Sequence, residues 1–135
     1  MKEIIAVIRM NKVGAMKKAL VEAGVNGFTA FRVLGRGKLV KDPSVIAERK
    51  HDLLALSPVA DEKAEEMATQ FLDGTRFFPR RLFTILAHDE EVPKIVAAII
   101  EANRTDNKVG DGKIFVLPVL DAIRVRTGET GDAAV

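Results

Sequence analysis

The chain has 135 residues, the size of a single domain with one hydrophobic core. No apolar stretch reaches the roughly 20 residues that cross a bilayer, and no small-residue cleavage site follows the apolar start of the chain. Cysteine is absent, which excludes disulfides and thiolate metal sites. The 21 basic and 19 acidic residues are mixed along the chain, and it has no Trp or Tyr to stack on bases. We therefore expect a cytoplasmic protein with no membrane insertion and no bound nucleic acid.

The first 37 residues predict a strand, a helix and a second strand. Residues 3–9 are β-branched and apolar with charges at both ends, as in a buried strand. Residues 13–23 carry apolar side chains at helical spacing, and Gly24 is typical of the end of a helix. A second strand is expected from about Phe28 to Leu34, before Gly35 and Gly37.

The middle of the chain, from about residue 38 to 77, is polar and charged. It is too long for an ordinary connection in a compact domain, and such loops usually carry function. Within it, residues 61–72 are strong helix formers, which Asp61 can cap and Asp73-Gly74 can end. This helix is either a solvated part of the loop or an element that binds a partner.

The second half predicts the same order of elements again. Residues 81–87 predict a third strand, and apolar residues from Val92 to Ile100 predict a second helix with Pro93 in its first turn. A glycine-bearing loop then leads into a fourth strand at residues 113–119, and residues 122–126 predict a last extended piece.

The order β-α-β, long loop, β-α-β predicts an α+β protein with the ferredoxin-like fold, an antiparallel sheet with both helices on one face. We expect one domain over residues 1–135, with a C-terminal tail from about residue 127. Because the strands are apolar on both sides, oligomerisation is the expected cover for the second face of the sheet.

The most informative motif is Gly110-Asp111-Gly112-Lys113. Two glycines one residue apart permit a sharp turn whose N–H groups suit phosphate oxygens, and Lys113 adds a cationic donor. Asp111 is expected to fix the turn rather than to act as an acid. The motif is short, and by itself it is more typical of a plain hairpin corner than of a phosphate site. In an extended segment, Arg124 and Arg126 would point to the same side and grip a polyphosphate together.

Two C-terminal stretches resemble a known family. Residues 108–119 (KVGDGKIFVLPV) and 123–133 (IRVRTGETGDA) closely resemble the C-terminal pattern of PII signal-transduction proteins. Further positions fall in the same register: residues 1–8, Lys12, the Ala-Leu pair of the first helix, Gly24, Gly27, Thr29, Val33, Gly35, Gly37, residues 98–100 and residues 104–105. The resemblance covers about two-thirds of the chain and leaves out the middle, which corresponds to the family's T-loop (about 38–77).

The resemblance implies a trimer that binds ATP or ADP in each cleft between subunits. Two sets of residues occupy the family's nucleotide-binding positions. The first comes from one subunit: Val7, Gly35, Gly37, Lys38, Leu86, Gly110, Asp111, Gly112 and Lys113. The second comes from its neighbour: Gly27 and Thr29 beside the base, and Arg124 and Arg126 on the phosphates.

Three positions depart from the family pattern. Leu39 stands where a glutamine helps to bind Mg and 2-oxoglutarate, and leucine cannot coordinate a hard cation. Arg80 replaces the lysine that pairs with 2-oxoglutarate, and an arginine can still clamp a carboxylate. Thr84 replaces a glutamate that contacts the nucleotide.

The resemblance implies a regulator of nitrogen metabolism that acts through its T-loop and is not an enzyme. The long loop is most similar to that of nitrogenase-associated PII proteins, which act with a sister PII protein on dinitrogenase, as a mixed or a homotrimeric assembly. The alternative target is an ammonium channel or an enzyme of nitrogen assimilation. Control by uridylylation of a loop tyrosine is excluded, since the chain has no tyrosine.

Two other classes of function have less support. An ATPase lacks a P-loop and a placed general base, and a nucleic-acid module lacks an aromatic platform. His51 and His88 are far apart in sequence and have no neighbours at the spacing of metal ligands, so no metal site is expected.

Overall fold

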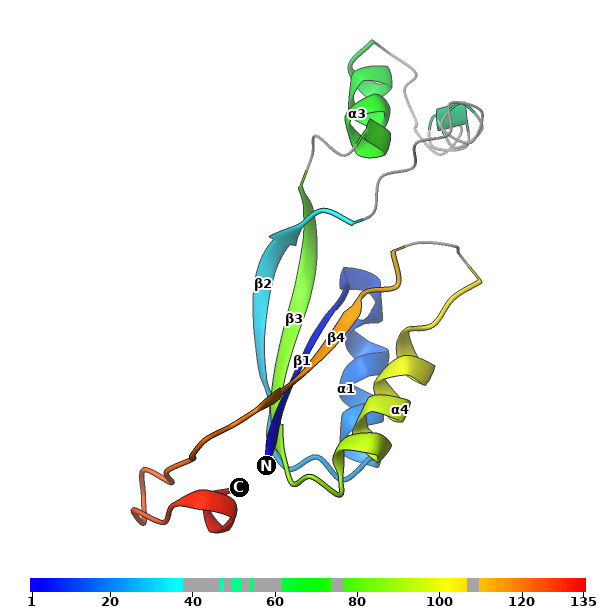
Figure 1. Ribbon diagram of the computed structural model, residues 1–135. Coiled ribbons are helices and arrows are strands. Elements are labelled where there is room, and N and C mark those ends of the chain that lie inside the picture. The colour runs from blue at the N-terminus through cyan, green and yellow to red at the C-terminus, as the bar shows by residue number, and fades with distance from the viewer. Residues whose placement is uncertain (38–46, 48–49, 52–53, 55–61, 74–76, 107–109) are drawn as a thin grey trace. The chain divides into compact units, whose positions relative to one another are not determined.

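The computed structural model describes residues 1–37, 47, 50–51, 54, 62–73, 77–106 and 110–135 (Figure 1). The chain divides into two compact units. One unit combines Met1–Val33 with Pro79–Val135, and the other consists of Leu34–Phe78.

The elements follow the predicted order. In the chain they are β1 (Lys2–Arg9), α1 (Val13–Glu22), β2 (Thr29–Gly35), α3 (Glu62–Asp73), β3 (Phe78–Ala87), α4 (Val92–Asn103) and β4 (Lys113–Pro118). One 3-10 turn, Met10–Lys12, leads into α1, and another, Gly131–Ala134, lies in the C-terminal tail. The four strands form one sheet in the order β2-β3-β1-β4, with β1 antiparallel to both β3 and β4. This confirms the ferredoxin-like fold.

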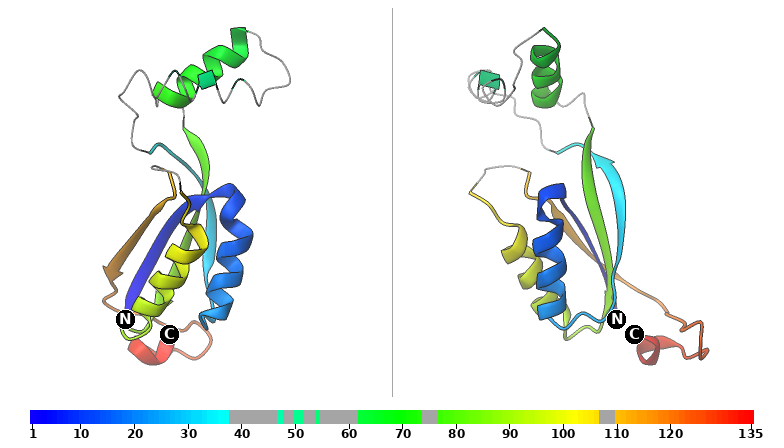
Figure 2. Two further views of the ribbon diagram at one scale, coloured as in Figure 1. Left: turned by 90° about the vertical axis from the view of Figure 1, so that its right-hand side faces the viewer. Right: turned by 180° about the vertical axis from the view of Figure 1, so that it is seen from behind.

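Helices α1 and α4 lie side by side on one face of the sheet (Figure 2). Every second residue of β1 points into this layer, so Ile4, Ala6 and Ile8 are buried while their neighbours are half-buried. From the helices, the core takes side chains one turn apart, such as Met16 with Leu20 and Ile95 with Ile99. Alternate residues of the strand and helix residues one turn apart therefore form one common core.

The opposite face of the sheet, called the open face below, is also apolar. The register places Ile5 of β1 between Thr84 and Phe115, and it places Glu3 between Leu86 and Leu117. Phe115 is 49% exposed and Leu117 39% exposed. Among the described elements of this unit, none covers the open face, and an apolar patch of this kind is typical of a surface that binds another protein.

Two element boundaries differ from the prediction. Strand β3 begins at Phe78 rather than at residue 81, because the ladder with β1 continues to the pair of Arg80 with Arg9. Helix α4 continues past Ile100 to Asn103, a polar residue that is buried. The Asn103 side-chain N–H donates a 2.8 Å hydrogen bond to the carbonyl of Ile99, while its side-chain oxygen is buried without a partner among the described residues.

Helix α3 belongs to the second unit and confirms the helix predicted within the central loop. Glu62 and Glu65 lie in its first turn, where negative charge is favourable. The Gln70 amide donates to the Glu66 carboxylate at 3.2 Å, and Lys50 forms an ion pair with Glu65 at 3.6 Å. Asp61, the expected cap, lies outside the described residues.

The prediction of an extended segment at residues 122–126 is wrong. Residues 125–127 form a turn, with the N–H groups of Thr127 and Gly128 donating to the carbonyl of Arg124. A short antiparallel bridge joins Ile123 to Thr130. Positive φ at Gly128 and Gly131 lets the chain reverse here, so Arg124 and Arg126 do not follow the alternation of a strand.

Phe83 is fully buried and tilts against Phe28 with ring centroids 5.6 Å apart. We expect Phe83→Ala to lower the free energy of unfolding by about 3–5 kcal/mol, through lost burial and the cavity it leaves. Urea denaturation at fixed protein concentration measures this change. Val21→Ala, at a side chain 65% exposed on α1, serves as control and should change it by less than about 0.5 kcal/mol. Equal effects of the two substitutions would contradict this description of the core.

Candidate anion-binding site

The glycine loop before β4 has a backbone that only glycine adopts easily. Gly110 has φ +96° and Gly112 has φ +120°. A Cβ atom on Gly112 would lie 2.2 Å from the carbonyl oxygen of Val7, so the loop packs directly on the end of β1. The predicted sharp turn is therefore confirmed, and the close approach to Val7 fixes its position on the sheet.

The side chain of Asp111 secures this loop from within. Its carboxylate accepts hydrogen bonds from the Thr105 hydroxyl at 2.6 Å and from the Thr105 N–H at 2.9 Å. These bonds, with a smaller contribution from the charge of Arg9, hold the pKa of Asp111 below its usual value. Asp111 thus fixes the turn as expected, although through Thr105 and Arg9 rather than through its own backbone.

Arg9 is the residue that the sequence analysis missed. Its Nε donates to the carbonyl of Gly110 at 2.8 Å, and its Nη2 lies 3.2 Å from the Asp111 carboxylate. The sequence shows Arg9 only as a charge at the end of a strand. Its role depends on the pairing of β1 beside β4, which links residues about 100 positions apart in the chain.

Cationic side chains gather at this end of the open face. Lys113 is exposed and lies opposite Val7 across β4 and β1, while Arg80 lies opposite Arg9 across β3 and β1. By strand alternation these positions lie on the open face. Burial, followed by the nearby charge of Arg9, lowers the pKa of Arg80. Two guanidinium groups and an ammonium beside a glycine loop form an arrangement suited to phosphate or carboxylate groups.

The other predicted site residues lie elsewhere in this unit. Leu86 pairs with Glu3 and Pro118 pairs with Lys2, so both lie at the other end of the sheet from Lys113. Arg124 and Arg126 follow Pro118 in the extension that leaves that end (Figure 1). Gly27 and Thr29 lie at the start of β2, next to the end of β3.

The structure therefore brings together Val7, Gly110, Asp111, Gly112, Lys113 and Arg80. It separates them from Leu86, Gly27, Thr29, Arg124 and Arg126. Gly35 ends β2 and Gly37 follows it in the second unit. Lys38 and Leu39 lie outside the described residues.

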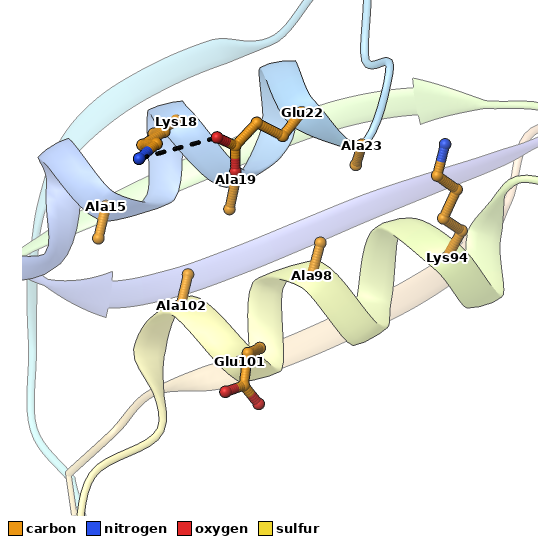
Figure 3. A pocket seen from close by; sticks show the side chains of 9 residues that line it. All are labelled: Ala15, Lys18, Ala19, Glu22, Ala23, Lys94, Ala98, Glu101 and Ala102. Carbon is orange, nitrogen blue, oxygen red and sulfur yellow. Dashed lines mark ion pairs between the residues drawn. The ribbon is translucent and has the colours of Figure 1, made fainter.

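A hollow between α1 and α4 is not a comparable site (Figure 3). Ala15 and Ala19 of α1, with Ala23 just after it, face two alanines of α4, Ala98 and Ala102. Lys18 at its border is paired with Glu22 at 3.8 Å. This hollow is the packing seam of two helices with small side chains and offers no converging set of donors.

Within the described ranges, no group of three or more His, Asp or Glu side chains could hold a metal ion. Across the same ranges, every helix falls short of the length and apolar character that a membrane span requires.

The fold and this site define a ferredoxin-like domain with a fixed glycine loop, cationic side chains beside it and an apolar sheet face that no described element of its unit covers. The family model "Nitrogen regulatory protein P-II" matches residues 1–129. The chain belongs to this family, whose members are signalling regulators of nitrogen metabolism and not enzymes. The match includes the central loop, so it extends further than the two-thirds of the chain recognised from sequence motifs.

Curated relatives match over the full chain. "Nitrogen fixation nifHD region GlnB-like protein 2" of Methanothermococcus thermolithotrophicus is 39% identical over 100% of this chain and 98% of that protein. The protein with the same description in Methanothermobacter marburgensis is 40% identical, with all of both chains covered. "Nitrogen regulatory protein P-II" of Cereibacter sphaeroides is 38% identical, again over all of both chains. The similarity to nitrogen-fixation-region proteins confirms the expected subfamily.

Gly112→Ala tests whether the glycine loop is held as described. The added Cβ would meet the Val7 carbonyl at a backbone conformation that alanine disfavours. We expect a lower melting temperature and faster amide exchange in the loop. Gly14→Ala is the matched control, because Gly14 lies in α1 with no atom within 4 Å of an added Cβ. Alanine there should be neutral or stabilising by about 1 kcal/mol. Equal tolerance of both substitutions would show that the loop does not lie against β1.

Proposed function

We propose that this protein binds ATP or ADP in clefts between neighbouring copies of the chain, and that the bound nucleotide controls a long loop that acts on a protein partner. On this proposal residues 1–135 act as one domain in the cytoplasm, with a T-loop at about 38–77 and a tail from about 127. The observation that carries the proposal is the glycine loop, which Asp111, Thr105 and Arg9 hold in place beside Lys113.

The phosphates are assigned to the glycine loop. A loop already fixed by protein contacts needs little ordering when a ligand arrives, which favours affinity. Lys113 supplies a cation beside it, and Val7 lies opposite Lys113 on the neighbouring strand. The loop N–H groups and Lys113 suit the charged end of a nucleotide, and Val7 offers an apolar contact beside them.

The base is assigned to the apolar region around Leu86. Val7 pairs with Leu82 and Glu3 pairs with Leu86, so the two regions are four residues apart along the strands. At about 3.3 Å per residue this separation is about 13 Å, comparable with an extended nucleotide. Thr84 lies between them, and its hydroxyl donates to the Glu3 carboxylate at 2.6 Å. The nucleotide would therefore lie along the open face.

On this proposal, Arg124 and Arg126 at each phosphate site come from a neighbouring copy of the chain. Within one chain, Arg124 and Arg126 follow the end of β4 that is remote from Lys113. A neighbouring copy packed on the open face would bring its own Arg124, Arg126, Gly27 and Thr29 to the cleft, and it would bury Phe115 and Leu117. This arrangement supports a trimer, formed either by identical chains or with a sister PII protein.

A second effector is assigned to Arg9 and Arg80. Arg9 and Arg80 lie directly opposite each other on adjacent strands, where like charges repel. A dicarboxylate such as 2-oxoglutarate would relieve this repulsion and form charge-assisted hydrogen bonds with Arg80. Any Mg ion would be held mainly by the nucleotide phosphates, because leucine at position 39 offers no oxygen ligand.

The partner is assigned as dinitrogenase. The two methanogen relatives described above carry names from the nitrogen-fixation nifHD region. The loop that would reach the partner contains α3, whose first turn is acidic. A regulator of an ammonium channel or an assimilation enzyme is the alternative.

Lys113→Ala and Arg124→Ala should each weaken ATP binding more than tenfold, since each removes a cation from the proposed phosphate site. Isothermal titration calorimetry measures the affinity. Lys18→Ala, which removes an exposed cation of α1 on the helix-covered face of the sheet, is the matched control and should leave the affinity unchanged. Wild-type affinity in both site variants would overturn the nucleotide assignment.

A further inference from the structure

We infer that Glu129 is a built-in competitor of phosphate, which occupies the guanidinium of Arg124 until a polyphosphate displaces it. The inference rests on the proposed function, because it concerns the regulation of the same nucleotide site. On this inference the C-terminal tail regulates how tightly the site binds nucleotide.

Both terminal nitrogens of Arg124 are engaged by the tail of its own chain. Nη1 lies 2.5 Å from the Glu129 carboxylate, and Nη2 donates to the carbonyl of Ala133 at 3.0 Å. The backbone repeats the pairing, since the Arg124 N–H donates to the Glu129 carbonyl at 2.9 Å. A guanidinium binds carboxylate and phosphate with the same fork of donors, so the two anions compete for one surface of the side chain.

The turn aims Glu129 at Arg124. Thr127 donates its hydroxyl to the same carboxylate oxygen at 2.8 Å, and positive φ at Gly128 folds the chain back between them. The tail is then fastened beyond Glu129. The N–H of Gly131 donates to the Asp121 carboxylate at 2.9 Å and to the Ala122 carbonyl at 3.0 Å. Asp132 next to Gly131 lies 3.6 Å from the N-terminal ammonium of Met1, so the tail is also held at the end of the sheet.

The ion pair between Arg124 and Glu129 is weak enough for a polyphosphate to break it. The side chain of Arg124 is 38% exposed and that of Glu129 is 47% exposed, and ion pairs at such exposure contribute little. A polyphosphate carries more charge than one carboxylate, and it gains further contacts with Lys113 and the glycine loop of the neighbouring copy. When the Arg124 guanidinium turns to a polyphosphate, Glu129 and the Ala133 carbonyl both lose its hydrogen bonds. The segment from Gly128 to Val135 would then be held less firmly, by the contacts of Gly131 and Asp132, and its amides would exchange faster.

Glu129→Gln tests the competition. It keeps the size of the side chain and removes the charge that holds Arg124. We expect ATP to bind about three- to fivefold tighter, the effect of one exposed ion pair. Glu101→Gln, the same change at an exposed residue of α4, is the matched control and should have no effect. In an Arg124→Ala background, Glu129→Gln should lose its effect, because Glu129 acts only through that arginine.

A second readout follows the tail itself. Hydrogen exchange of the amides from Gly128 to Val135 should become faster in wild type when ATP is added, and it should already be fast in Glu129→Gln without ATP. Melting curves of the variants confirm that the fold is retained.

The possible outcomes separate the two proposals. ATP binding that is unchanged or weaker in Glu129→Gln, with normal binding in wild type, would overturn the competition and leave the nucleotide site intact. An equal gain in ATP affinity in Glu129→Gln and Glu101→Gln would show that the effect comes from net charge alone. That result would also overturn the proposed competition. No ATP binding in wild type or in any variant would overturn the proposed function together with the inference.

Discussion

Strand β1 lies between β3 and β4, and its two antiparallel ladders determine which side chains of the sheet enter the core and which lie on the open face. One set of its side chains, Ile4, Ala6 and Ile8, forms the centre of the core beneath α1 and α4. The other set contributes to the open face, with Ile5 and Val7 between residues of the neighbouring strands. Because side chains alternate with a period of two, a slip of one residue would exchange the core side chains and those of the open face. The core therefore fixes the position of the site.

The same pairing places the predicted site residues at two ends of the sheet. Arg9, at the end of β1, holds the glycine loop through Gly110 and Asp111, and Lys113 begins β4 at that point. Strand β4 then runs antiparallel to β1 and carries the chain to the opposite end before Arg124 is reached. On the proposed function, the two parts of the phosphate site lie at opposite ends of the sheet and meet through a second copy. The open apolar face provides a surface on which that copy can pack.

The sequence predicts the architecture well because the core strands and helices have clear periods. It also predicts the glycine loop, because positive φ at Gly110 and Gly112 is a local property of glycine. It misses Arg9 and the early start of β3, since both depend on pairing between distant segments rather than on local pattern. It wrongly predicts an extended segment at Arg124, where Gly128 and Gly131 permit a turn that hydrogen bonds with Glu129 stabilise. An alternating pattern of apolar and charged residues does not by itself exclude such a turn.

The central claim is that one nucleotide site is shared between two copies of the chain. Subunit mixing tests it directly. Lys113→Ala and Arg124→Ala chains each lack one half of every site, but a mixed oligomer contains interfaces at which both halves are native. The two variants, unfolded together and refolded as a mixture, should recover high-affinity ATP binding at a fraction of the sites, as measured by equilibrium dialysis. If the mixture binds no better than either variant alone, with mixed oligomers shown by native mass spectrometry, the site is not shared and the account is contradicted.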